Sequence, residues 1–269
     1  MPRIERALAP VAIDGAWLAA YCRSIGLPAN GTGRLPPLAL QIAAAPLHLA
    51  LLADRRFPFR AFGLVHVAQR VVQSGDLAPS SRLALSARTT QGQRARRGMT
   101  FGLVTEARVD GRVAWSGETT VLAIARACGS EPPPRPGPRA QTDPNPVEQD
   151  TETDLRFEAT VRVPEALGRR YAAIAGDLNP IHQHAWLARP FGFRRAIVHG
   201  TWTLAHALAL AEVPARSTYT LDARFRRPVE LPSDIAVRAY SGLDELRTRV
   251  VVSSPDGATV HLDALLVEA

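Results

Sequence analysis

Residues 129–154, GSEPPPRPGPRAQTDPNPVEQDTETD, hold seven of the chain's 22 prolines and almost no apolar side chains. Proline fixes φ and biases the residue before it toward extended backbone, so such a stretch does not join a packed core. It predicts a semi-rigid, solvated linker. The linker divides the 269 residues into an N-terminal half, residues 1–128, and a C-terminal half, residues 155–269. Each half is long enough to bury a core of its own.

The C-terminal half contains one long apolar run followed by several short ones. Ala196–Val213 is too long for a strand, and its apolar density predicts a buried helix. A shorter helix is predicted before it, over Pro164–Ile174. Four runs with the composition of strands come after the long helix: Thr218–Pro228, Asp234–Tyr240, Leu246–Ser253 and Thr259–Val267.

The N-terminal half repeats this order of a helix and four strands. Leu38–Asp54 has the same apolar density and predicts a helix, kinked at Pro46 because proline lacks the N–H donor that a helix needs. The strand-like runs after it are Val65–Gln73, Arg82–Thr89, Phe101–Asp110 and Arg112–Ala125. We interpret the repeat as an internal duplication in which an antiparallel sheet wraps one long helix in each half. The expected fold class is therefore α+β.

Charge and cysteine content argue against several classes of protein. The net charge is +7, and all 32 basic residues are scattered arginines with few aromatics among them, so a nucleic-acid partner is not expected. No apolar run reaches the roughly 18 residues of a membrane-spanning helix, and the N-terminus lacks an apolar signal-peptide core. Cys22 and Cys128 have neither metal-ligand nor redox spacing. The sequence thus predicts a cytoplasmic protein that does not enter a membrane.

The residues that can do chemistry are concentrated in residues 171–203, YAAIAGDLNPIHQHAWLARPFGFRRAIVHGTWT. Asp177 follows a predicted helix end at Gly176, and His182 comes five residues later in the same turn. A carboxylate and an imidazole on one tight turn can hold a water molecule and move its protons. Gly200 opens the long helix, where an unpaired backbone N–H can stabilise an oxygen that becomes negative. This combination suits the addition of water to a bond conjugated to a carbonyl, or its removal.

The sequence Gly176–His182, GDLNPIH, followed by Ala196–Gly200, AIVHG, resembles the hydratase motif of the MaoC-like dehydratases. Members of that family are (R)-specific enoyl-thioester hydratases of the hotdog fold. The duplicated pattern of helix and sheet extends the resemblance over nearly the whole chain, as in the double-hotdog members. The N-terminal half has no copy of the motif, which agrees with family members that carry a single competent site.

The resemblance implies a role for each residue of the motif. Asp177 and His182 would bind the catalytic water and move its proton to or from the carbon beside the carbonyl, while Asn179 would orient the turn. The Gly200 N–H would bind the thioester oxygen, and the N-terminal half would supply an acyl-chain tunnel. The implied reaction interconverts trans-2-enoyl and (3R)-3-hydroxyacyl thioesters of coenzyme A or an acyl carrier protein, without a cofactor or a metal.

Further candidates for substrate contact surround the motif. Arg189, Arg194 and Arg195 could grip the phosphates of coenzyme A, because guanidinium groups form bidentate bonds to phosphate, or they could be a solvated loop. His199 is open to two interpretations, a group that supports the site or a buried structural histidine. Trp202 is expected in the core or in the lining of the tunnel.

Two alternatives keep the fold and change the activity. One is a non-catalytic module that binds acyl thioesters, and the other is an acyl-CoA thioesterase. The presence of both Asp177 and His182 argues against binding alone, since binding needs neither group. A metal site at Asp177, His182, His184 and His199 is disfavoured because no further ligand spacing supports it. Pairing of chains into a homodimer is left open.

Overall fold

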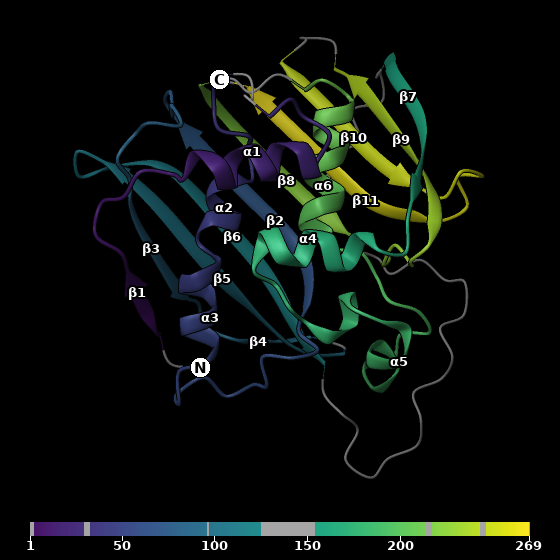
Figure 1. The fold of residues 1–269 in the computed structure, drawn as a ribbon, viewed down its shortest axis with the longest axis horizontal. Helices are drawn as coiled ribbons and strands as arrows, with labels where there is room; N and C mark the ends of the chain where they lie inside the picture. Colours follow the sequence, from purple (N-terminus) through teal and green to yellow (C-terminus); the bar gives the residue numbers. More distant parts are fainter. Residues whose placement is uncertain are drawn as a thin grey trace.

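One antiparallel sheet of eleven strands runs through both halves of the described chain (Figure 1). The structure is a computed structural model and describes residues 3–29, 33–95, 97–124, 154–213, 217–242 and 246–268. The predicted linker lies outside these residues except for Asp154, and so does Cys128. The predicted domain boundaries at residues 128 and 155 therefore stay a prediction.

The described part of each half begins with a strand, continues through helices and ends in further strands. The N-terminal half contains β1 (Glu5–Ala7), α1 (Gly15–Ser24), α2 (Ala39–Ala43), α3 (Ala45–Leu52), β2 (Val65–Ser74), β3 (Ala84–Thr89), β4 (Gln93–Ala95), β5 (Gly98–Val109) and β6 (Arg112–Ile124). The C-terminal half contains β7 (Asp154–Val163), α4 (Leu167–Ala175), α5 (Ala185–Ala188), α6 (Gly200–Leu210), β8 (Thr218–Phe225), β9 (Ser233–Ser241), β10 (Arg247–Ser253) and β11 (Val260–Glu268). Two 3-10 turns, Pro180–His182 and Arg189–Phe191, flank α5.

The order of the strands in the sheet is the same in both halves. It is β1-β3-β5-β6-β2 in the N-terminal half and β7-β9-β10-β11-β8 in the C-terminal half, with the short β4 added onto β5. The equivalent strands β2 and β8 pair with each other in the middle, where Val71 lies opposite Leu221. This repeated order agrees with the interpretation of the sequence as a duplication.

The helices lie on one face of the sheet in Figure 1, with α6 crossing the strands of the C-terminal half and α2 and α3 those of the other half. The buried apolar side chains of the two halves form one continuous core between this helical layer and the sheet. Two indole N–H groups also tie the halves together. Trp17 donates to the Ile174 carbonyl at 3.0 Å, and Trp202 donates to the Ser24 carbonyl at 2.8 Å. The end of α4 and the start of α6 are thereby fixed against α1.

The two predicted long helices are shorter than expected. In the C-terminal half α6 begins only at Gly200, since Ile197 is extended and bridges to Glu230. In the N-terminal half the kink expected at Pro46 is a complete break between α2 and α3. In a continuous helix the ring of Pro46 would clash with the carbonyl four residues earlier. The helix therefore ends before Pro46, and α3 begins with Pro46 in its first turn.

Five described helices and strands were not predicted from the sequence: α1, α5, β1, β4 and β7. The three strands lie at or near the margins of the sheet, where one side of the ladder is open. β1 and β4 have only three residues each and so show no alternation, whereas β7 alternates apolar and polar residues from Leu155 to Val163. β7 begins at Asp154, the last residue of the predicted linker. No described helix is long and apolar enough to cross a membrane.

Candidate active site

The turn at residues 177–182, which carries most of the motif, is positioned by the end of α4. The helix buries Tyr171, Ala172 and Ala175 and ends at Gly176, whose φ of 69° lies in the left-handed region that glycine enters without strain. Gly168 on the same helix packs directly against the carbonyl of His182, where a Cβ would collide. A glycine inside a predicted helix is a sequence signal for such an approach, and sequence reasoning did not use it.

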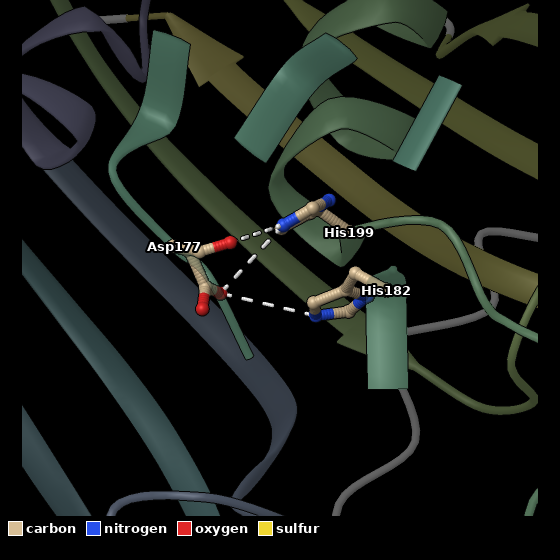
Figure 2. Close-up of side chains that lie close together, drawn as sticks. All are labelled: Asp177, His182 and His199. Atoms are coloured by element: carbon tan, nitrogen blue, oxygen red, sulfur yellow. Dashed lines mark hydrogen bonds and ion pairs between the residues drawn. The ribbon is translucent and has the colours of Figure 1, made fainter. Parts of the chain in front are cut away.

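Asp177 and His182 face each other across this turn (Figure 2). Asp177 Oδ2 lies 3.8 Å from His182 Nε2, which is too far for a direct hydrogen bond. A water oxygen can lie about 2.8 Å from both atoms, because two acceptors at this separation bracket one donor. The His182 side chain is 9% exposed, whereas the Asp177 side chain is 52% exposed. The pair therefore meets a substrate through its carboxylate side.

The tautomer of His182 follows from its backbone partner. Its Nδ1 lies 2.8 Å from the carbonyl oxygen of Ile197. A carbonyl only accepts hydrogen bonds, so Nδ1 carries the proton and Nε2 presents a lone pair toward Asp177. Burial lowers the pKa of His182 against the opposing influence of the Asp177 charge and the Ile197 bond. His182 is therefore a neutral acceptor at neutral pH.

His199 lies beneath this pair and holds Asp177 from the other side. Its Nε2 lies 3.1 Å from the Asp177 carbonyl oxygen and 3.9 Å from Asp177 Oδ2, and its ring stacks on His182 with centroids 3.7 Å apart (Figure 2). Nε2 is thus the protonated nitrogen, and the buried Nδ1 has no partner among the described residues. Burial and the neighbouring His182 lower the pKa of His199 to about 3.

The charge of Asp177 is set by opposing influences. Partial removal from water by itself raises the pKa of the carboxyl group. The imidazoles of His199 and His182 and the Asn179 N–H, which donates to Asp177 Oδ1 at 3.1 Å, outweigh this and lower the pKa below its ordinary value. At neutral pH the site therefore holds one carboxylate and two neutral imidazoles.

Asn179 connects the turn to the N-terminal half. Its Oδ1 accepts from the Ile181 N–H at 3.5 Å, which caps the 3-10 turn, and from the Gly63 N–H at 3.4 Å. Its Nδ2 donates to the Leu64 carbonyl at 3.3 Å. Sequence reasoning missed Gly63 and Leu64, because both act through backbone atoms that carry no residue signature. The orientation of the motif thus depends on a loop more than 110 residues away in sequence.

Gly200 is the first residue of α6, and His199 precedes it as the N-cap. A first-turn N–H has no acceptor within its own helix, and the helix dipole makes this end positive. Phe225 packs against the Cα of Gly200 so closely that a Cβ would come within 2.9 Å of its ring. The Gly200 N–H is therefore a suitable donor to an oxygen that develops negative charge.

The predicted substrate-binding residues lie in different places. Arg189, Arg194 and Arg195 are exposed and line one surface pocket of about 730 Å³ together with Glu230. Trp202 is 4% exposed, bonded to Ser24 and stacked on His206, so it lies inside the core.

Asp177, His182 and His199 also place potential metal ligands within 4.8 Å of one another. His199 Nε2 already donates to a backbone carbonyl, so only the carboxylate and His182 Nε2 point lone pairs into this space. Two acceptors fit a bound water better than the three or four ligands of a typical zinc site.

Comparison with known proteins identifies the family. The family described as "MaoC like domain" matches residues 146–260. 3-Hydroxyacyl-thioester dehydratase X of Mycobacterium tuberculosis is 32% identical over 232 residues, which cover 86% of this chain and 78% of that protein. The chain belongs to the MaoC-like dehydratase family. The resemblance found in the sequence motif is thereby confirmed.

Solved structures confirm the fold of this MaoC-like protein. The crystal structure of HtdX of Mycobacterium tuberculosis matches with a TM-score of 0.80 and 26% identity, covering 99% of this chain and 100% of that one. Another protein of that organism, described as having a double hotdog fold, matches with a TM-score of 0.52 and 14% identity over 98% of this chain and 95% of that one. The α+β double hotdog expected from the sequence is correct.

The depressed histidine pKa values predict a loss of stability in acid. His199 has a pKa of about 3 and His48 one of about 4 because of burial, whereas an unfolded histidine titrates near 6.5. Below about pH 6.5 these histidines bind protons in the unfolded chain but stay neutral in the folded chain. As the pH falls toward about 4, each of them therefore lowers the free energy of unfolding by at most about 1.4 kcal/mol per pH unit.

Urea unfolding across this range measures the slope. The variant His48→Gln removes one of these groups, and its slope should be shallower than that of the wild type. Equal slopes for both proteins, or a stability that does not depend on pH, would contradict the assignment of buried neutral histidines.

Proposed function

We propose that the chain catalyses the reversible addition of water to a trans-2-enoyl thioester, giving a (3R)-3-hydroxyacyl thioester, with Asp177 and His182 as the acid/base pair. As a MaoC-like dehydratase the chain is a lyase. The observation that carries the assignment of residues is the pair itself, a carboxylate and a neutral imidazole 3.8 Å apart. Both present lone pairs to the same space, beside the N-terminus of α6.

In the hydration direction, Asp177 Oδ2 and His182 Nε2 accept hydrogen bonds from the two O–H groups of one water. As the water oxygen bonds to C3 and the C2–C3 double bond becomes single, the Asp177–His182 pair takes one proton from the water and delivers one proton to C2. In the reverse direction the proton leaves C2 and returns to the departing hydroxyl. Water and thioester supply every atom of this reaction, so it needs neither cofactor nor metal.

The thioester oxygen becomes negative when C2 carries the electron pair. The Gly200 N–H and the positive end of α6 would stabilise it, and they act more strongly on this oxyanion than on the neutral carbonyl. His199 and Asn179 serve as positioning residues in this proposal. His199 holds the backbone of Asp177, and Asn179 anchors the turn to Gly63 and Leu64.

The carrier of the acyl group is a coenzyme A or acyl carrier protein thioester, both of which bear phosphate. The pocket of Arg189, Arg194 and Arg195 supports a phosphate contact, although Glu230 in the same wall offsets one charge. The acyl-chain tunnel in the N-terminal half, the cytoplasmic location and any homodimer stay predictions from the sequence.

Asp177→Asn tests the acid/base assignment. The change is nearly isosteric but removes the carboxylate, so kcat should fall by about 10²–10⁴-fold. The measurement is the loss of the conjugated enoyl absorbance over a series of trans-2-enoyl-CoA chain lengths. Asp222→Asn is the matched control, because Asp222 is a partly exposed carboxylate that pairs with Arg70.

Equal activity of Asp177→Asn and the wild type would refute the role of Asp177. A wild type that binds acyl-CoA without turning it over would favour the binding module, and release of free thiol would favour a thioesterase.

Replacing Arg189, Arg194 and Arg195 together by alanine tests the phosphate contact. KM for enoyl-CoA should rise about tenfold or more with kcat little changed, because the phosphates lie far from the reacting carbons. Arg162→Ala, which removes an exposed arginine paired with Asp234, is the control for the loss of a surface arginine outside the pocket. If KM stays at the wild-type value, the arginine pocket does not hold the carrier.

A further inference from the structure

His66, in the half that lacks the motif, is aimed at the active site by a distortion of β2. Along this strand the odd-numbered residues Gln69, Val71 and Gln73 are buried, while Arg70 is exposed and pairs with Asp222. Alternation alone would therefore turn His66 to the face of Arg70.

A β-bulge at the start of β2 reverses this alternation. The register of β2 against β6 shifts between His66 and Ala68, which leaves Val67 as the extra residue. A bulge turns the residues before it to the other face of the sheet, and such distortions are common beside active sites. His66 consequently points to the inner face, where its ring lies 4.5 Å from that of Phe225, centroid to centroid.

The imidazole of His66 is fixed and neutral. Its Nε2 lies 2.9 Å from the Ala68 carbonyl oxygen, so Nε2 carries the proton and donates to it. Burial lowers the pKa of His66 to about 4 against the Ala68 bond and the nearby negative charge of Asp177. The ring thus acts at neutral pH as a flat, uncharged surface next to the catalytic turn.

Phe225 contacts both His66 and Gly200, the residue whose N–H is the proposed oxyanion donor. Its ring lies between His66 and the Cα of Gly200, where a Cβ would come within 2.9 Å. An aromatic ring can usually turn away from such a contact, but here the His66 ring packs against it, tilted by 51°. The position of the Phe225 ring, which packs against the Cα of Gly200, is therefore set in part from the other half of the chain.

We propose that His66 is a positioning residue of the hydratase site, which acts through the ring of Phe225 to set the space at the Gly200 N–H. The kinetic part of this proposal rests on the proposed function. In this proposal the N-terminal half, which lacks the motif, contributes to transition-state stabilisation through His66, in addition to its hydrogen bonds from Gly63 and Leu64 to Asn179. It also explains the bulge at Val67, which sheet pairing alone does not require.

The kinetic test compares His66→Ala with His66→Phe. The first removes the ring, and kcat should fall about tenfold or more while KM changes little, because a misplaced oxyanion donor weakens binding of the transition state more than that of the substrate. His66→Phe restores an aromatic surface and should recover most of kcat. His206→Ala is the matched control, because His206 is also a half-buried imidazole held by a backbone carbonyl, that of Ile25, and its kcat should stay at the wild-type value.

A purely structural role would lower the melting temperature of His66→Ala and leave kcat per folded enzyme unchanged, which would overturn the proposal. A His66→Phe variant as slow as His66→Ala would overturn it as well, since the imidazole and not its surface would then be needed. If the wild type itself shows no turnover, the proposed function fails and the contact is decided by unfolding measurements.

The unfolding measurements use Gly200→Ala in two backgrounds. In the wild type the new Cβ meets a Phe225 ring that His66 blocks, so Gly200→Ala should destabilise the fold. In His66→Ala the ring can move away, and Gly200→Ala should cost less, which appears as non-additive changes in the unfolding constant. Additive effects would show that His66 does not hold Phe225 against Gly200.

Discussion

The antiparallel pairing of β2 with β8 is the contact on which the site depends. It joins the two halves into one sheet and sets the start of β2 beside the end of β8. The backbone of Gly63 and Leu64, just before β2, therefore reaches Asn179, and His66 at its start reaches Phe225. The C-terminal half alone would not place the catalytic turn in the same way, because Asn179 would lose its partners Gly63 and Leu64 and Phe225 would lose its contact with His66.

The electrostatic character of the site follows from its burial. Two imidazoles stacked 3.7 Å apart would repel each other if both were charged, and burial keeps them neutral. Each has its proton fixed by a backbone carbonyl, Ile197 for His182 and Asp177 for His199. The one charge left in the group is the Asp177 carboxylate, which lies at the accessible edge. A single water held there meets two acceptors and no competing donor.

Much of this arrangement could be predicted from the sequence. The motif around Asp177, His182 and Gly200 led to the correct family and fold, and the structure brings these three residues to one place. The apolar runs also predicted the inner strands, which have a neighbour on each side, because their burial requires a clear pattern of apolar residues.

The rest could not be predicted, because it depends on the backbone and on distant contacts. α6 starts later than its apolar pattern because Ala196–Val198 are buried in an extended segment rather than a helix. β1 has only three residues, too few to show alternation, whereas β7 does alternate apolar and polar residues from Leu155 to Val163 and is the exception that could have been predicted from the sequence. His66 has no acidic neighbour in sequence that would point to a role in the site, and only the bulge at Val67 turns it toward the site.

Hydration in deuterated water tests the central claim most directly. If Asp177 and His182 activate water for addition to the enoyl thioester, the product formed from a short trans-2-enoyl-CoA should carry one deuterium at C2 and a hydroxyl at C3 in the R configuration, with the thioester intact. A product with the S configuration, or release of free coenzyme A in place of a hydroxyacyl thioester, would contradict the account.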